Sequence, residues 1–145
     1  MTAAPAWFHS ALEVPFTTAY VDYDGTAIRT LRWGTPGAEP MLLVHGGLAH
    51  ANWWQWLAPQ WMAGRDIVAL DLSGHGESGR RDSYKGETWV DEIAAVARHY
   101  FSDRKPLLVG HSLGGLLAAG AAAYHPDLWR AIVISDSPMP DDTRH

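Results

Sequence analysis

One serine at the centre of a glycine-bounded turn has the surroundings that nucleophilic chemistry requires. Ser112 lies in the stretch GHSLGG, with Gly110 and Gly114 two positions to either side. A serine hydroxyl becomes a nucleophile when it is exposed, held in one direction and reached by a base. A sharp turn from a strand into a helix meets the first two conditions, and it needs small residues at positions 110 and 114. We therefore predict that Ser112 is a nucleophile and that the N–H of Leu113 points to where an oxyanion would form.

The elements that must position this turn are a strand before it and a helix after it. The apolar stretch 106–109 predicts a buried strand, and the small residues of 113–123 predict a helix. Upstream, Asp24-Gly25 separates two alternating stretches, 16–23 and 26–33, and so predicts an antiparallel hairpin.

The rest of the chain alternates strand and helix patterns. Short apolar runs predict further buried strands at 41–44, 66–72 and 131–135. Spacings of three and four predict helices at 52–62 and 88–101, the second with Thr88 and Asp91 as a capping pair. The predicted fold class is α/β, a mainly parallel sheet with helices on both faces. Such sheets bind ligands at the carboxyl ends of their strands, where the glycine- and serine-rich motifs lie.

Composition excludes several classes of function. The chain has 145 residues, no cysteine and a formal charge of −5 without a basic stripe, so we expect neither a disulfide framework nor a nucleic-acid partner. No His or carboxylate cluster has metal-ligand spacing, and no nucleotide-binding motif appears, so no metal or cofactor is expected. The N-terminus lacks the pattern of a secretory signal and no apolar run is long enough to cross a bilayer. We expect a cytoplasmic protein that does not bind a membrane.

Three motifs in a fixed order make the chain resemble the α/β-hydrolase superfamily. They are HGG at 45–47, DLSGHGESG at 71–79 and GHSLGG at 110–115, and the resemblance runs from about residue 16 to 138. It implies that the Ser112 turn is a nucleophile elbow and that Gly47, or else Leu48, supplies a second oxyanion-hole N–H. In relatives the histidine at position 45 orders the oxyanion loop, which we favour here over a role as general base.

Other candidate site residues follow from their places in these motifs. Leu48, His111 and Trp53 are candidates for contacting a substrate. For His111 we favour a packing or hydrogen-bonding role, with its side chain pointing away from the serine direction, and tryptophans at helical spacing more often belong to the core. Asp136 follows the strand at 131–135, where some relatives carry the catalytic acid; the alternative is a residue that orders the loop.

The resemblance also implies that residues are missing. The chain divides into an N-terminal segment (1–15), the N-terminal part of a hydrolase core (16–138) and the start of a cap or tail (139–145). It is truncated after the sixth of eight expected strands, before the position where relatives carry the catalytic histidine. The strand at 131–135 would be an unprotected edge, so we expect it to pair with a C-terminal remainder or a companion chain.

Two hypotheses follow. The first is a serine hydrolase that cleaves a carboxylic ester or related acyl substrate without a cofactor, needs a histidine from outside this chain and is inactive without it. Lactone, peptide and carbon–carbon cleavage and perhydrolysis stay open, whereas serine in place of aspartate disfavours epoxide hydrolases and haloalkane dehalogenases. The second is a catalytically incomplete fragment that binds a ligand or partner.

Overall fold

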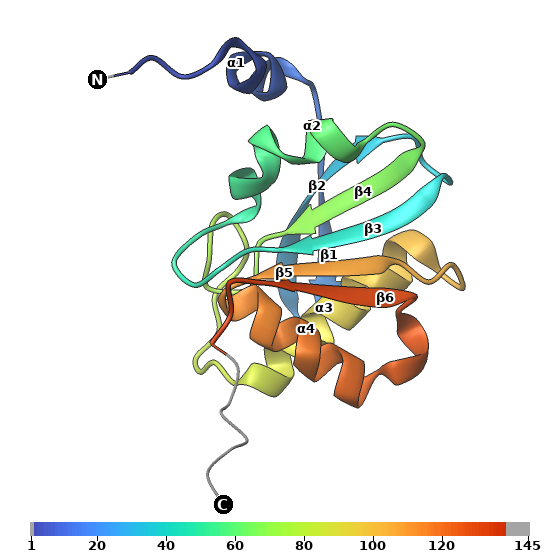
Figure 1. The fold of residues 1–145 in the computed structure, drawn as a ribbon. Coiled ribbons are helices and arrows are strands. Elements are labelled where there is room, and N and C mark those ends of the chain that lie inside the picture. Colours follow the sequence, from blue (N-terminus) through green and yellow to red (C-terminus); the bar gives the residue numbers. More distant parts are fainter. Residues whose placement is uncertain (1, 139–145) are drawn as a thin grey trace, which may run out of the picture.

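A six-stranded sheet forms the centre of the molecule, which is described by a computed structural model over residues 2–138 (Figure 1). The strand order across the sheet is β1-β2-β4-β3-β5-β6. The bounds are β1 Thr17–Tyr23, β2 Thr26–Gly34, β3 Glu39–Val44, β4 Arg65–Leu70, β5 Leu107–His111 and β6 Ala131–Ser135.

The first two strands form the predicted hairpin. β1 and β2 are antiparallel, with Tyr23 opposite Thr26 across the two-residue turn. Asp24 and Gly25 both have positive φ, 49° and 75°. Positive φ at both central residues is what a two-residue turn needs to match the twist of the strands, which is why Asp-Gly is favoured there.

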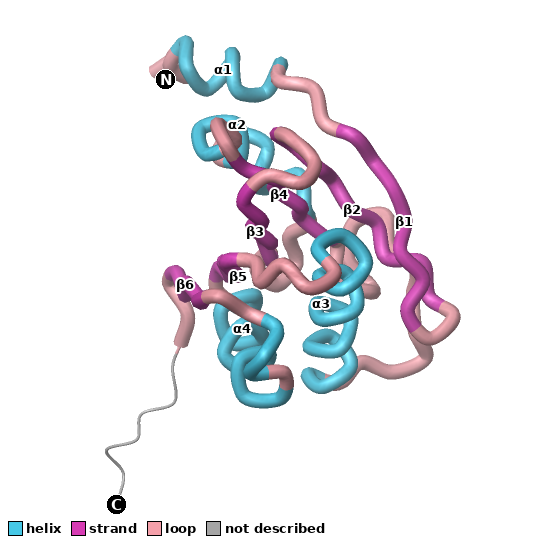
Figure 2. Tube along the Cα trace, turned by 90° about the vertical axis from the view of Figure 1, so that its right-hand side faces the viewer, coloured by secondary structure: helices cyan, strands magenta, loops and turns pink. Residues whose placement is uncertain are grey.

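The other neighbouring strands, β3, β4, β5 and β6, pair in parallel, while β2 joins β4 in antiparallel fashion. Helices α3 (Gly86–Phe101) and α4 (Leu113–Tyr124) cover one face. The short helices η1 (Ala51–Trp56) and α2 (Ala58–Trp61) lie on the other face, with α1 (Ala6–Glu13) beyond them (Figures 1 and 2). The predicted α/β class is confirmed. A short 3₁₀ turn, η2 (Pro126–Leu128), follows α4.

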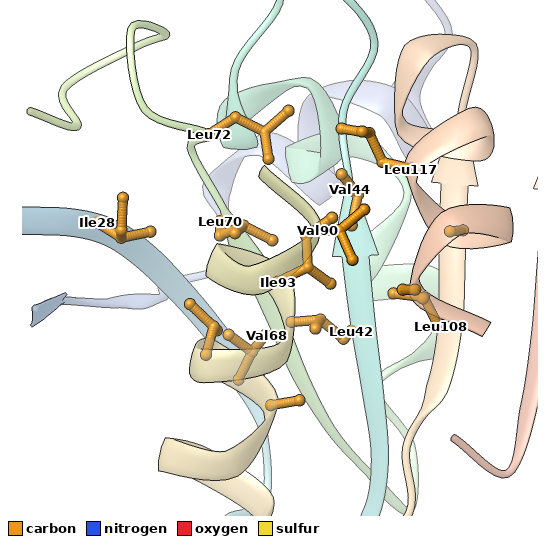
Figure 3. Packing of buried hydrophobic residues seen from close by; sticks show 14 of the residues in the cluster. Ile28, Leu42, Val44, Val68, Leu70, Leu72, Val90, Ile93, Leu108 and Leu117 are labelled. Atoms are coloured by element: carbon orange, nitrogen blue, oxygen red, sulfur yellow. The ribbon is translucent and has the colours of Figure 1, made fainter. Parts of the chain in front are cut away.

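Buried side chains fill both faces because alternate residues of a strand point to opposite sides. Leu42 and Val44 of β3 join Ile93 of α3 and Leu117 of α4 in one core cluster (Figure 3). Leu43, between them in sequence, belongs to the second cluster together with residues of η1 and α2. A strand that is covered on both faces consists of consecutive apolar residues, and such runs were the basis for predicting these strands from the sequence.

The predicted helix at 52–62 is wrong, because the segment consists of η1 and α2 with a break at Leu57. Pro59 stands in the first turn of α2, where a missing N–H costs nothing. The same proline could not donate the hydrogen bond that a continuous helix requires. The N–H of Leu57 instead donates to the Trp54 carbonyl oxygen at 3.0 Å, which closes η1 as a 3₁₀ turn.

The predicted capping pair of α3 is also wrong. The helix begins at Gly86 with Lys85 as its N-cap residue, and no side chain caps it. The Asp91 carboxylate instead accepts hydrogen bonds from Tyr23 and His125, at 3.4 and 2.8 Å. Asp91 therefore connects α3 to β1 and to the end of α4.

At one end of the described sheet, β6 has β5 as its neighbour. Its side chains alternate between exposed and half-buried, and Val133 is 45% exposed. The predicted cap or tail segment 139–145 lies outside the described residues. None of the helices within 2–138 is both long and apolar enough to cross a membrane.

Candidate active site

Ser112 stands between β5 and α4 in an unusual backbone conformation. β5 ends at the residue before it, two residues later than predicted, and α4 begins at the residue after it, as predicted. Its φ and ψ are 53° and −116°, a region that residues other than glycine adopt only where the surroundings hold them. Its side chain makes no capping hydrogen bond to α4, while its carbonyl oxygen accepts hydrogen bonds from the Gly115 N–H and the Ser137 hydroxyl. The backbone of Ser112 is thus fixed without the use of its hydroxyl.

Two glycines make this turn sterically feasible. A Cβ atom at Gly110 would collide with the carbonyl oxygen of Gly114, and one at Gly114 would collide with the carbonyl oxygen of Val44. Neither neighbour is the movable end of a side chain, so larger residues would displace backbone. The close approach of β5, β3 and α4 therefore explains the glycine spacing around Ser112.

The loop after β3 lies against the Ser112 turn. A Cβ atom placed on Gly46 would lie 3.3 Å from the Cβ of Ser112, and one on Gly47 would lie 3.7 Å from Cδ2 of Leu113. Leu113 is the first residue of α4, so its N–H has no partner within the helix. The structure thus brings Gly47 and Leu113 together. Leu48 is fully exposed and has a φ of 60°, at a turn in which the Ala49 N–H donates to the Gly46 carbonyl oxygen.

His45 connects this loop to the end of β4. The Leu72 N–H donates to Nε2 at 3.1 Å, so the ring proton is assigned to Nδ1, which donates to the Gly46 carbonyl oxygen at 2.7 Å. Burial lowers the pKa of His45 to about 4, and the nearby His75 ring contributes in the same direction. With both nitrogens engaged, His45 is neutral and is not free to accept a proton from Ser112, in agreement with the favoured ordering role.

A buried carboxylate that the sequence reasoning missed supports the same region. Asp71 is fully buried and accepts hydrogen bonds from the Glu77 N–H at 2.8 Å and the Ala51 N–H at 2.6 Å. Arg29 contacts Asp71 at 3.4 Å and donates to the Asn52 side chain at 2.9 Å. This network joins β2, the loop after β4 and the start of η1. The available signal was Arg29, a charged residue that lies at a buried position of β2.

A second buried carboxylate was missed on α3. Glu92 is fully buried, although it belongs to a helix with a solvent-exposed side. It accepts hydrogen bonds from the Ser73 N–H at 3.0 Å and from Nε of Arg81 at 2.9 Å. Through these two hydrogen bonds, Glu92 joins the glycine-rich loop after β4 to α3. Removal of Glu92 or of Arg81 would leave a buried charge or donor unpaired, which destabilises the folded protein.

The remaining predicted residues lie around the same edge of the sheet. The His111 ring stacks on Trp53, with centroids 5.6 Å apart and planes at 19°. Both border a cavity of about 370 Å³ that also includes Ser135. Asp136 follows β6, is exposed and has a φ of 51°. The Ser112 N–H donates to the Ser135 carbonyl oxygen at 2.9 Å, so the end of β6 is joined to the serine turn.

Metal ligation receives no support from the described part of the chain. Residues 2–138 contain no group of three or more His, Cys, Asp or Glu side chains placed to hold a metal ion. The buried carboxylates Asp71 and Glu92 are instead paired with arginines and backbone N–H groups.

Comparison with known protein families identifies the family to which this fold belongs. The family model described as the alpha/beta hydrolase fold matches residues 39–145. The chain belongs to this family. The match contains β3 and all three motifs of the Ser112 edge, whereas α1 and the β1–β2 hairpin lie before it.

Several curated proteins are similar in sequence. An esterase of Mycobacterium tuberculosis is 36% identical over 113 residues, which is 76% of this chain and 36% of the relative. The pimeloyl-[acyl-carrier protein] methyl ester esterase of Edwardsiella ictaluri is 33% identical over 111 residues, 74% of this chain and 41% of the relative. The chain thus spans less than half the length of these relatives.

Solved structures agree with the family. The thioesterase domain from the curacin biosynthetic pathway superposes with a TM-score of 0.82 at 30% identity, covering 91% of this chain and 48% of that one. A bacterial membrane phospholipase A gives a TM-score of 0.81 at 28% identity, covering 96% and 44%. These four relatives are named as esterases, a thioesterase domain and a phospholipase A.

Proposed function

We propose that this chain carries the nucleophile and the oxyanion hole of a serine hydrolase that cleaves a carboxylic ester or related acyl substrate. The observation that carries the proposal is the conformation of Ser112. Its backbone is held in a rarely populated region where β5 meets α4, directly beside the Gly46-Gly47 loop. Strained backbone conformations cluster at active sites, and nucleophile turns are a recurrent case.

The proposed reaction has two steps, acylation of Ser112 and hydrolysis of the acyl-serine. The Ser112 oxygen attacks the substrate carbonyl carbon as a base takes the hydroxyl proton, and the negative charge moves to the carbonyl oxygen. The N–H groups of Gly47 and Leu113 stabilise that oxyanion, each contributing about 2.7–4 kcal/mol in the transition state. The alcohol leaves with the proton from the base, and water then hydrolyses the acyl-serine by the reverse sequence of proton transfers.

The base is proposed to be a histidine outside this chain, because His45 is engaged at both nitrogens and His111 stacks on Trp53. Asp136 is the candidate acid, and it lies after β6 next to the residue that binds the Ser112 N–H. The chain alone is therefore expected to be inactive. We propose that the protein is cytoplasmic, because the chain has no cysteine to form the disulfide bonds that are common in small secreted domains.

The exposed strand β6 supports the need for further residues. Its parallel pairing with β5 leaves its other edge without a strand among residues 2–138, and Val133 is 45% exposed. Parallel strands are normally covered on both faces and paired at both edges. We propose that a C-terminal remainder or a companion chain pairs there and brings the catalytic histidine.

A fluorophosphonate probe tests the nucleophile directly. The chain is compared with the complete protein that includes any residues following His145, and each is treated with the probe and analysed by intact mass. Covalent labelling is expected in the complete protein and is lost in Ser112→Ala. Ser83→Ala, a change at an exposed loop serine, serves as the control and keeps the label. No labelling of the complete protein, or labelling that survives Ser112→Ala, would exclude the proposal.

A further inference from the structure

The last glycine of the GHSLGG motif has a steric cause of its own. Backbone atoms exclude a side chain at Gly110 and Gly114. At Gly115 a Cβ atom would instead collide with the hydroxyl oxygen of Ser137, and it would lie 2.9 Å from Cγ2 of Ile134 on β6. The first turn of α4 therefore leaves a position open beside Gly115, and the side chain of Ser137 occupies it.

From this position Ser137 binds the backbone of Ser112. Its hydroxyl donates to the Ser112 carbonyl oxygen at 2.7 Å, while the alternative acceptor, the Ser135 carbonyl oxygen, lies at 3.4 Å. The shorter contact has the length of a good hydroxyl hydrogen bond. The Ser135 carbonyl oxygen in turn accepts the Ser112 N–H at 2.9 Å. The chain at the end of β6 thus binds both backbone polar groups of Ser112.

A bend at Asp136 brings the two contacts together. Asp136 lies between Ser135 and Ser137 and has a φ of 51°, in the left-handed region. Aspartate is one of the few residues other than glycine that adopt this region as single residues. This backbone role does not depend on the Asp136 carboxylate.

The contact from Ser137 fixes more than Ser112, because a peptide unit is planar. The Ser112 carbonyl and the Leu113 N–H belong to one trans peptide, in which they point in opposite directions. A hydroxyl that holds this carbonyl oxygen therefore also sets the direction of the Leu113 N–H. It polarises the same peptide, which strengthens the N–H as a donor. An oxyanion donor acts only where it is aimed at the developing charge.

We propose that Ser137 is a positioning residue, whose hydroxyl aims the Leu113 N–H at the oxyanion through the Ser112 carbonyl. The inference rests on the proposed function, because it takes Ser112 as the nucleophile. The hydroxyl binds the side of the peptide opposite the N–H and does not touch the reacting atoms. A hydroxyl that only secured the end of β6 would change the stability of the fold, whereas a positioning hydroxyl changes the rate of the folded enzyme.

The test measures kcat and KM for hydrolysis of 4-nitrophenyl acetate by the complete protein, including any residues that follow His145. Ser137→Ala removes the hydroxyl, and kcat should fall about three- to tenfold, the effect of one neutral hydrogen bond on a rate. KM should change less than about twofold, since the contact acts in the transition state. Ser137→Thr keeps a hydroxyl and should restore kcat, and Ser83→Ala, at an exposed loop, should leave it unchanged.

A second variant displaces the hydroxyl without changing Ser137. Gly115→Ala places a Cβ atom where the hydroxyl lies, so kcat should fall by a similar factor. Gly120→Ala is the matched control on α4, because its Cβ would meet only the end of the Val90 side chain, and it should keep the wild-type kcat. Thermal unfolding confirms that each variant is folded at the assay temperature.

The outcomes separate this inference from the proposed function. No ester hydrolysis and no fluorophosphonate labelling of the wild type would overturn the hydrolase, and the role of Ser137 with it. An active wild type whose kcat survives both Ser137→Ala and Gly115→Ala would leave the hydrolase and overturn the positioning role alone. A loss of kcat that Ser137→Thr does not restore, or a change confined to KM, would overturn it as well.

Discussion

Acid should destabilise this protein through His45 well before its carboxylates are protonated. Burial lowers the pKa of His45 to about 4 from the ordinary value of 6.5, so the unfolded chain takes up the proton first as the pH falls. Stability that is complete above pH 6.5 is therefore lost progressively down to about pH 4. Between pH 8 and pH 5 the loss from this one group is about 2 kcal/mol.

The comparison variant is His45→Gln, whose amide can donate to the Gly46 carbonyl oxygen and accept from the Leu72 N–H without titrating. Urea unfolding at pH 8 and pH 5 gives the free energy of unfolding of each protein by linear extrapolation. The drop from pH 8 to pH 5 should be about 2 kcal/mol larger in the wild type than in the variant. His99→Gln, at an exposed position of α3, controls for the loss of a histidine as such.

An equal drop in the wild type and His45→Gln would refute the reasoning, because it would mean that His45 is not held neutral by burial. A larger drop in the variant would show that the ring takes up a proton in the folded state and is stabilised by it.

Three further predictions concern stability and are measured by urea or thermal unfolding. Asp66→Asn removes a buried carboxylate paired with two partly exposed arginines, and should cost about 2–3 kcal/mol, less than a fully buried pair. Gly114→Ala forces a Cβ atom against the Val44 carbonyl oxygen and should cost about 1–3 kcal/mol; an unchanged midpoint would show that the turn can relax. Ile93→Ala empties part of the core cluster and should cost about 2–5 kcal/mol, whereas a loss below 1 kcal/mol would mean that the cavity collapses.

Local sequence patterns were sufficient for most of the elements. The Asp24-Gly25 hairpin and the buried strands were predicted because turn chemistry and apolar runs act over a few residues. The predicted helix at 52–62 failed for a reason that is also local: Pro59 fits the first turn of a new helix better than the middle of a long one. The cap of α3 failed because Asp91 found partners on β1 and at the end of α4.

Sequence patterns likewise found some residues of the candidate site and missed others. Ser112, its two glycines and the motif at 45–47 were found from sequence because a tight turn imposes residue types at fixed spacing. Buried charges such as Asp71 and Glu92 were missed, since their partners lie far away in sequence and pairing depends on how strands are ordered.

By itself, the sequence determined that this is an α/β-hydrolase chain with a serine at a strand-to-helix turn, because those signals depend on neighbouring residues. Only the tertiary structure decided that His45 is neutral and engaged at both nitrogens, that Gly47 lies beside Leu113, and that the Ser137 hydroxyl binds the Ser112 carbonyl oxygen. Each of these depends on burial or on contact between distant segments. The packing of the chain, and not its local pattern, sets the surroundings in which Ser112 would react.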